Sequence, residues 1–373
     1  MIDPVEFLQA LKSQGVGFFS GVPDSLLQHF CACLAEHASA REHLIAANEG
    51  GAVAAAIGYH LATGRTPLVY MQNSGLPNAL NPLLSLADPA VYAIPMLLLI
   101  GWRGEPGTLD EPQHRKQGEV TLPLLAASQI GYAIIDATTT DPDATIREAL
   151  QQAAGGPYAL VVRKGTFSAY RTPLPIRATG SFRREQAVGL IADSLEAGDL
   201  VVATTGMTAR ELCAHRERSS QSHDRDFLVI GGMGHASQIA HTLALYRSDR
   251  HVYCLDGDGA VLMHMGALAI IGATPRSNLC HIVVNNGVHE SVGGQPTVGL
   301  AVDLLALARS VGYATAIRVT SLDELPRALE ELRRGEGPAL LEVQVTPGHR
   351  ADLGRPQSDP VDAKKAWLSA LLG

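Results

Sequence analysis

The sequence predicts an α/β protein built from two parallel β-sheets, each with helices on both faces. Near-continuous apolar runs alternate with helical stretches along the chain, which is typical of parallel strands buried on both sides. The runs fall into two sets, and a stretch with little periodicity separates them. A chain of 373 residues is also too long for one comfortable core and suits two domains.

Each set of apolar runs contains six predicted strands. The first set covers residues 16–22, 43–48, 67–72, 95–101, 132–136 and 158–165, and the second covers residues 200–206, 226–232, 251–257, 279–287, 315–319 and 339–345. Residues 167–185, with two prolines and a glycine, read as the connection. We therefore predict a first domain over residues 1–175, a linker over 176–182 and a second domain over 183–373.

Both ends of the chain predict helices. Asp3 is a helix cap and Pro4 suits the first helical position, while residues 359–373 form a plausible closing helix. The N-terminus lacks the basic start and apolar stretch of a signal peptide. The longest apolar run, residues 94–100, is far shorter than the ~20 residues that a membrane span needs.

Composition and cysteine spacing exclude several classes of protein. Hydrophobic residues make up 46% and charged residues 18%, and the net charge is −8. The basic residues form no long run, which argues against nucleic acid as the main partner. Of the five cysteines only Cys31 and Cys33 are close, at a spacing that no common zinc motif uses. We expect reduced, buried thiols in a cytoplasmic protein.

Many predicted strands end in a turn that contains glycine or polar residues. The seven turns read GVPDS, NEGG, QNSG, TTGMT, GGMG, GDGA and NNG. Glycines alone can account for a single turn. In an open parallel sheet, however, ligands bind at the carboxyl ends of the strands. The pattern therefore predicts ligand chemistry along one edge of each sheet.

Two of these turns predict a magnesium and diphosphate site. Asp258 lies between two glycines before a helical stretch, and Asn286 follows the next strand. A helix start suits phosphate, and a carboxylate beside phosphate makes sense if a divalent cation lies between them. Mg²⁺ prefers such oxygen ligands. A dinucleotide fold is less favoured because no G-x-G-x-x-G follows a first strand, and the P-loop sequence is absent.

The spacing of GDG, 25 residues and NN resembles the cofactor signature of the thiamine diphosphate enzymes. The resemblance implies that Asp258, Asn286 and the main-chain carbonyl of Val288 hold Mg²⁺. It also implies that each domain has the thiamine diphosphate-binding fold, with a pyrimidine domain first and a diphosphate domain second. The implied cofactor-binding residues are Glu49, Gly206, Met207, Thr208, Gly231, Met233, Gly257, Asp258, Gly259, Ala260 and Asn286.

Glu49 is the implied partner of the cofactor's aminopyrimidine ring. It follows an apolar strand and opens an alanine-rich helix, where a glutamate by itself is usually a solvated acid. Facing a pyrimidine nitrogen, it would hold or share a proton and thereby promote removal of the thiazolium C2 proton. Met233, in the resembling GGMG turn, would wedge between the two cofactor rings, although ordinary core packing is the alternative.

A closer resemblance is to the phosphonopyruvate decarboxylase family and its near relative, the sulfopyruvate decarboxylases. The matching stretches include GVPDSLL, DEPQHRKQG, GGMGHAS and NNGVHESVGGQPT. The resemblance implies decarboxylation of 3-phosphonopyruvate to phosphonoacetaldehyde and CO₂ in phosphonate biosynthesis. Asp24 and His114 resemble in position the acid and histidine that non-oxidative decarboxylases place over the cofactor, although an ordinary surface-loop histidine is the alternative for His114. The candidate substrate contacts are Ser25, Arg103, His289, Ser291 and Gln295.

Other interpretations remain open at this point. A sulfopyruvate decarboxylase is the first alternative, and another decarboxylase that acts on 2-oxo acids is the second. A carboligase of the acetolactate type normally needs a middle domain for which this chain has no room. A non-catalytic regulatory subunit would not need both Glu49 and Asp258. The resemblance further implies a homodimer or larger homo-oligomer, with active sites between chains.

Overall fold

The computed structural model describes residues 1–171 and 180–372, which form two compact units. The first unit contains residues 1–171 together with Ser291–Gln295, and the second contains residues 180–290 and 296–372. Of the predicted linker, residues 176–179 lie outside the described residues, and 180–182 lead into the first helix of the second unit. The predicted domain boundaries therefore stay a prediction.

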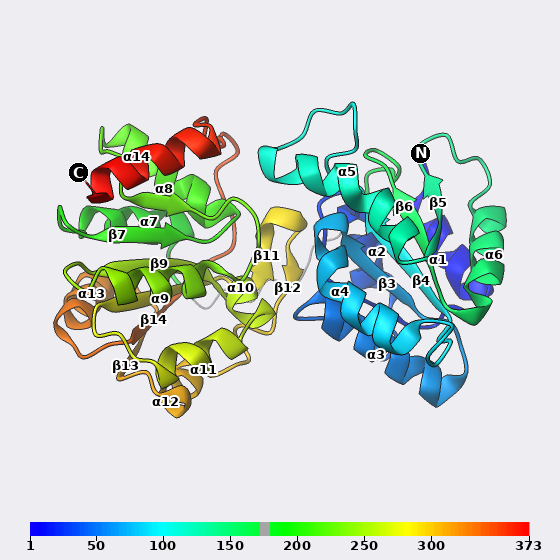
Figure 1. Ribbon diagram of the computed structural model, residues 1–373, viewed down its shortest axis with the longest axis horizontal. Coiled ribbons are helices and arrows are strands. Elements are labelled where there is room, and N and C mark those ends of the chain that lie inside the picture. The colour runs from blue at the N-terminus through cyan, green and yellow to red at the C-terminus, as the bar shows by residue number, and fades with distance from the viewer. Residues whose placement is uncertain (172–179, 373) are drawn as a thin grey trace. The chain divides into compact units, whose positions relative to one another are not determined.

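The first unit is a six-stranded parallel sheet, with the strand order β2-β1-β3-β4-β6-β5 (Figure 1). Its strands are β1 (Phe19–Gly21), β2 (His43–Ile45), β3 (Leu68–Gln72), β4 (Met96–Gly101), β5 (Gly131–Ile135) and β6 (Pro157–Val162). Its helices are α1 (Pro4–Ser13), α2 (Gln28–His37), α3 (Glu49–Thr63), α4 (Leu76–Pro82), α5 (Pro112–Ala127) and α6 (Pro142–Gln152).

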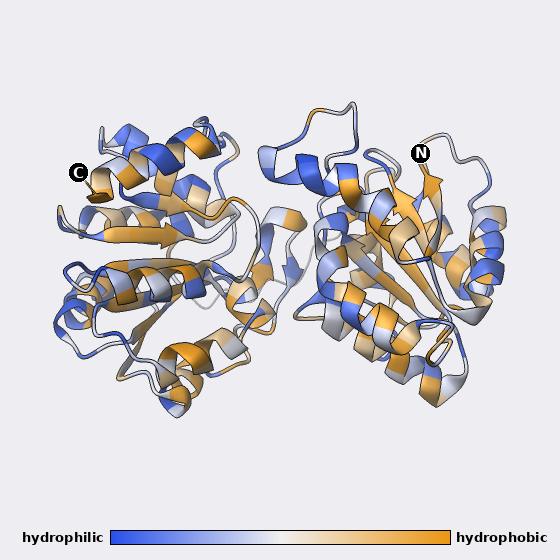
Figure 2. Ribbon diagram, viewed as in Figure 1, coloured by the Kyte–Doolittle hydropathy of each residue, from blue (hydrophilic) through white to orange (hydrophobic). Residues whose placement is uncertain are grey.

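Both faces of this sheet are buried, and alternate side chains of one strand show it. In β4, Leu97 and Leu99 pack into one core with residues of α1, α2 and α6, while Leu98 and Ile100 pack into a second core with α3 and α4. Successive side chains of a strand point to opposite faces. The strand is therefore apolar at every position from Met96 to Ile100 and appears mostly orange in Figure 2.

The second unit repeats this architecture with the strand order β13-β14-β10-β9-β7-β8. Its strands are β7 (Leu200–Ala203), β8 (Asp226–Leu228), β9 (Val252–Gly257), β10 (Leu279–Asn285), β13 (Thr315–Val319) and β14 (Ala339–Gln344). Its helices are α7 (Arg184–Asp193), α8 (Met207–Arg218), α9 (Ala236–Tyr246), α10 (Asp258–Met263), α11 (Gly266–Ala273), α12 (Leu304–Val311), α13 (Leu325–Arg334) and α14 (Pro360–Leu372). Separate cores on the two faces contain residues of α7, α8 and α13, and of α9, α11, α12 and α14.

All twelve predicted strands and both terminal helices are confirmed. Asp3 caps α1 by accepting hydrogen bonds from the backbone N–H groups of Val5 and Glu6. The five cysteines are free and buried, as expected. Among the described residues, no helix is both long and apolar enough to cross a membrane.

Two local features differ from the prediction. The helical stretch after Asp258 is divided into α10 and α11, because His264 leaves the helical backbone region before Gly266 begins the second helix. A short two-stranded ladder, β11 (Val288–His289) with β12 (Gln295–Pro296), follows Asn286 and was not predicted. Strands of two residues are too short to give a periodic signal.

Candidate active site

Candidate site residues lie at the carboxyl edges of both sheets. In the first unit they follow β1, β2 and β4, which lie on one side of the sheet in the order β2-β1-β3-β4. In the second unit they follow the four neighbouring strands β10, β9, β7 and β8. The carboxyl ends of parallel strands share one edge of a sheet, which is the usual place for a ligand.

Glu49 is the first residue of α3, and its side chain is held in a buried position. Asn48 caps the helix by accepting the Gly51 N–H at 2.8 Å, which fixes the turn that carries Glu49. Glu49 is 5% exposed, and the Asn78 side-chain amide donates to its Oε2 at 3.0 Å. A Cβ atom on Gly75 would overlap the Glu49 carboxylate, so the glycine is what leaves room for it.

Asp24 follows β1 and is fully buried. Its Oδ1 accepts from the Gln72 side chain at 2.7 Å, and its Oδ2 accepts from the Leu26 N–H at 3.0 Å. Burial raises the pKa of Asp24, although the hydrogen bonds from Gln72 and Leu26 oppose the rise. Asp24 therefore keeps a proton to higher pH than an ordinary aspartate, which suits a proton donor.

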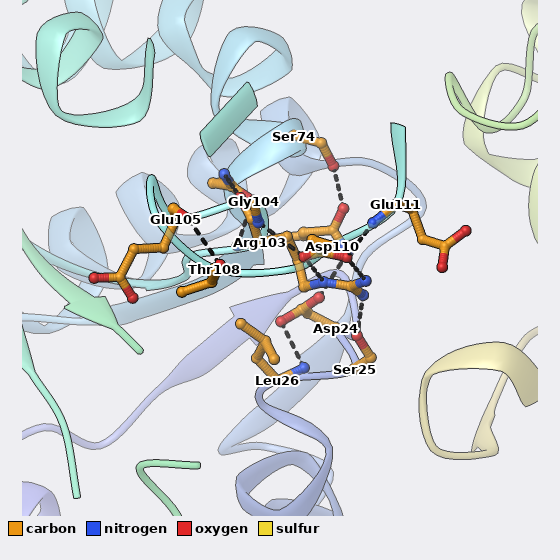
Figure 3. Close-up of polar contacts among 12 residues, drawn as sticks. Asp24, Ser25, Leu26, Ser74, Arg103, Gly104, Glu105, Thr108, Asp110 and Glu111 are labelled. Carbon is orange, nitrogen blue, oxygen red and sulfur yellow. Dashed lines mark hydrogen bonds and ion pairs between the residues drawn. The ribbon is translucent and has the colours of Figure 1, made fainter. Parts of the chain in front are cut away.

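Arg103 follows β4 and forms an ion pair with Asp110 (Figure 3). Its Nε and Nη2 donate to the two oxygens of Asp110 at 2.8 and 2.5 Å, and its Nη1 donates to the Ser25 hydroxyl oxygen at 2.8 Å. The backbone N–H groups of Gly104 and Glu111 also donate to Asp110. Asp110 balances the charge of Arg103, and Ser25 accepts from Arg103, so the Ser25 hydroxyl proton remains able to donate elsewhere.

His114 lies in the first turn of α5, beside the turn that contains Arg103. Its Nδ1 is buried and has no hydrogen-bond partner among the described residues. Burial, with a smaller effect of the Arg103 charge, lowers the pKa of His114 to about 4. At neutral pH His114 is therefore an uncharged imidazole that can accept a proton or relay one.

In the second unit, Asp258 is a buried carboxylate at the end of β9. It is 3% exposed, and the Thr297 hydroxyl donates to its Oδ2. Burial raises the pKa of Asp258 to about 6, although the hydrogen bond from Thr297 opposes the rise. Among the described residues, no Lys or Arg forms an ion pair with Asp258. A buried carboxylate without a cationic partner fits a metal ligand.

The two asparagines after β10 have different hydrogen-bond partners. Asn285 is used internally, because its amide donates to Glu342 at 2.8 Å and to the Gly299 carbonyl at 3.0 Å and accepts from the Gly287 N–H. Asn286 donates to Glu290 at 2.8 Å, and within the described part of the chain its Oδ1 accepts from the Val288 N–H alone, at 3.1 Å. An amide oxygen can accept a second bond, so the Asn286 oxygen keeps a free acceptor position, and its assignment as a metal ligand stays a prediction.

The turn between β7 and α8 leads directly into the start of a helix. Gly206 precedes α8 with a φ of 97°, a conformation that favours glycine, and Met207 and Thr208 open the helix, whose first N–H groups have no partner within it. The Thr204 hydroxyl is buried without a partner among the described residues. This turn suits an anion such as a diphosphate.

Two further candidates, His289 and Met233, lie beside Gly259, the second residue of α10. A Cβ atom on Gly259 would come within 3.1 Å of the His289 ring and within 3.3 Å of the Met233 methyl group. Burial lowers the pKa of His289 to about 4, so the ring is uncharged at neutral pH. The other predicted positions lie nearby in sequence: Gly231 follows β8, Gly257 ends β9, Ala260 lies in α10 and Val288 lies in β11.

Ser291 and Gln295 lie in the segment that groups with the first unit. Ser291 is exposed, and neither polar atom of the Gln295 amide has a hydrogen-bond partner among the described residues. Their assignment as substrate contacts stays a prediction.

A cluster of charged side chains next to Asn286 was not predicted from the sequence. Arg184 is 5% exposed and donates twice to Glu211 and once to Glu290. Burial opposes ionisation of Glu290, but Arg184 and His349 hold its pKa below the usual value. The sequence offered one indication of this cluster: Glu290 lies four positions after the predicted ligand Asn286. Such a spacing is common on any protein surface and predicts no contact by itself.

Comparisons with known proteins match two parts of the chain to described domains. Residues 6–123 match the family described as thiamine pyrophosphate enzyme, N-terminal TPP binding domain, and residues 204–343 match the corresponding C-terminal TPP binding domain. The fold and the two matched domains define a thiamine pyrophosphate enzyme.

Three curated relatives cover nearly the whole chain. Two proteins named phosphonopyruvate decarboxylase, from Streptomyces viridochromogenes and Streptomyces hygroscopicus, are 35% and 36% identical; each alignment covers 98% of this chain, with 94% and 93% of the relatives. A sulfopyruvate decarboxylase from Methanosarcina acetivorans is 26% identical over 100% of this chain and 98% of its own. The chain belongs to the phosphonopyruvate decarboxylase family.

Proposed function

We propose that this protein decarboxylates 3-phosphonopyruvate to phosphonoacetaldehyde and CO₂, with thiamine diphosphate and Mg²⁺. The observation that supports it most is the full-length similarity to two phosphonopyruvate decarboxylases, combined with intact candidate residues for both ends of the cofactor. The reaction breaks the bond between the carboxyl carbon and the 2-oxo carbon. One proton replaces CO₂ on that carbon, so the site needs a proton donor.

The residues of the second unit suit the cofactor's diphosphate. Asp258 and Asn286 offer a carboxylate and an amide oxygen, and the Val288 carbonyl completes the proposed Mg²⁺ ligands. The first N–H groups of α8 and the Thr204 hydroxyl would donate to phosphate oxygens. When bound, thiamine diphosphate supplies an electron sink for the electrons released with CO₂.

Residues of the first unit would manage the protons. Glu49 would hold the proton that it shares with the aminopyrimidine nitrogen, and the Asn78 amide keeps its carboxyl group in place. Asp24, whose burial favours the protonated form, would deliver the proton that replaces CO₂. His114, neutral at physiological pH, would relay a proton between solvent and Asp24.

Neutral donors would bind the substrate phosphonate. The Ser25 hydroxyl, fixed by Arg103, is able to donate, and we propose Ser291, Gln295 and His289 as further contacts. Arg103 would act mainly by orienting Ser25, because Asp110 already balances its charge. The family resemblance also supports a homodimer or larger homo-oligomer, a cytoplasmic location and a role in phosphonate biosynthesis.

The substrate is tested by comparing three 2-oxo acids. We expect CO₂ release that depends on thiamine diphosphate and Mg²⁺ with 3-phosphonopyruvate. With sulfopyruvate and with pyruvate we expect kcat/KM lower by about tenfold or more, since a contact built for a dianion discriminates by about 1.4 kcal/mol or more. A higher kcat/KM on sulfopyruvate would favour the alternative, which the Methanosarcina relative supports more weakly.

The Gly75→Ala variant tests the position of Glu49. The backbone of Gly75 has φ −84° and ψ −14°, which alanine adopts readily, so only the new methyl group matters. It would push the Glu49 carboxylate aside, and we expect kcat to fall about 10²-fold, the effect of a misplacement near 1 Å.

The matched control is Gly58→Ala within α3. A Cβ atom at Gly58 has no atom within 4 Å, so this variant should keep full activity and gain about 1 kcal/mol of stability. Equal activity of the two variants in a steady-state assay would contradict the proposed role of Glu49.

A further inference from the structure

Glu290 connects the proposed metal ligand Asn286 to a buried ion pair. Its Oε2 accepts two hydrogen bonds, one from the Asn286 amide nitrogen at 2.8 Å and one from Arg184 Nη1 at 2.6 Å. Arg184 is in turn held by Glu211, with donor–acceptor distances of 2.7 and 2.9 Å. All four residues belong to the second unit.

The other oxygen of Glu290 is fixed as well. Its Oε1 accepts from the Gly348 N–H and from His349 Nδ1, both at 2.9 Å. The side chain of Glu290 is 10% exposed, and that of Arg184 is 6% exposed. With both oxygens engaged and little solvent access, the carboxylate of Glu290 has no room to rotate away from Asn286.

This arrangement determines which atom Asn286 presents. A carboxylate oxygen can only accept, so Glu290 selects the NH₂ group of the amide and turns the Oδ1 atom to the opposite side. A cation binds an amide only through oxygen, and a flipped amide would offer it two N–H groups. The negative charge of Glu290 also polarises the amide and makes its oxygen a stronger ligand.

We propose that Glu290 is a positioning residue for the metal: it locks the orientation of the Asn286 amide and thereby sets the affinity for the divalent cation. This inference rests on the proposed metal site but not on the proposed substrate. Arg184 and Glu211 contribute by anchoring the carboxylate of Glu290 where it meets Asn286.

The test measures Mn²⁺ binding by electron paramagnetic resonance, with saturating thiamine diphosphate and no substrate. Glu290→Met removes the acceptor at nearly constant volume, and we expect the Kd for Mn²⁺ to rise about 10- to 100-fold. Glu290→Gln keeps an oxygen that Arg184 and Asn286 can both use, so we expect a change of about threefold or less.

A second background separates orientation from general disruption. A carboxylate in place of the Asn286 amide has two equivalent oxygens and needs no orienting partner. In the Asn286→Asp background, Glu290→Met should therefore leave the Kd unchanged or lower it, because it also removes a like charge. His349→Gln, which alters only the contact with Oε1, should stay within about threefold of the unmodified chain.

Several outcomes would overturn the inference. These are an unchanged Kd in Glu290→Met, equal losses in Glu290→Met and Glu290→Gln, or the same loss in both backgrounds. Glu290→Leu, which also removes the acceptor, replaces Glu290→Met if the latter does not fold, and the melting temperature of the metal-free variants monitors this. If the unmodified chain binds no Mn²⁺ with thiamine diphosphate, the proposed metal site itself is wrong.

Discussion

Asp258→Ala is expected to abolish binding of thiamine diphosphate at modest Mg²⁺ concentrations. The variant removes the only carboxylate among the proposed metal ligands and leaves the Thr297 hydroxyl without its acceptor. Losing one member of a buried pair of opposite charges costs about 2–5 kcal/mol, which corresponds to about 30- to 5,000-fold in Kd. Isothermal titration calorimetry at fixed Mg²⁺ measures this change, and a Kd within threefold of the unmodified chain would contradict the assignment.

In the metal-free protein, the ionised form of Asp258 is expected to lower the free energy of unfolding. Because the pKa of Asp258 is raised from 3.8 to about 6, folding favours its protonated form. The stabilising contribution of protonated Asp258 is complete below pH 3.8 and is lost as the pH rises through 6. The free energy of unfolding should differ by about 3 kcal/mol between these two limits. Asp258→Asn should therefore raise the melting temperature of the metal-free protein at pH 7.5 relative to the unmodified chain. The advantage should disappear near pH 4.

Glu49→Gln is expected to lower kcat by about 10²- to 10⁴-fold, the usual effect of losing a proton-transferring group. Glutamine has nearly the same volume and can still accept from Asn78, so the buried site should keep its shape. The Kd for thiamine diphosphate should change by about threefold or less. Steady-state kinetics and calorimetry together separate these two effects.

The contrast between the two variants is the sharper test. Asp258→Ala should fail to bind the cofactor, whereas Glu49→Gln should bind it and fail to turn over substrate. Glu42→Gln is a suitable control for Glu49→Gln, because Glu42 lies in the same unit as Glu49 and forms an ion pair with Lys12. Equal cofactor affinity in Asp258→Ala and Glu49→Gln would contradict both assignments.

The central strands could be predicted because both of their faces are buried. A strand such as β4 or β10 must be apolar at almost every position, and a run of this kind between glycine turns has few other interpretations. The division between α10 and α11 could not be predicted, since one polar residue and one glycine, His264 and Gly266, are tolerated inside a helical pattern and do not by themselves mark a break.

The candidate site was only partly predictable. Glu49, Asp258 and Asn286 belong to short motifs with a fixed place after a strand, so their spacing carries information. The role of Arg103 did not follow from its place in a strand-end loop, because its Asp110 partner is set by how the next loop folds back. The Arg184–Glu290 pair joins residues 106 positions apart, and no local pattern predicts such a contact.

The sequence by itself determined two parallel sheets, the edges at which their turns gather, and the residues with cofactor chemistry. These properties follow from local rules: strand periodicity, turn composition and the spacing of a short motif. Only the tertiary structure decided which charges are already neutralised and which buried groups still lack a partner. Arg103 is balanced by Asp110, whereas Asp258 has no basic partner among the described residues. The physical reason is that the free energy of a charged group depends on its burial and its neighbours, and folding brings those neighbours from distant parts of the chain.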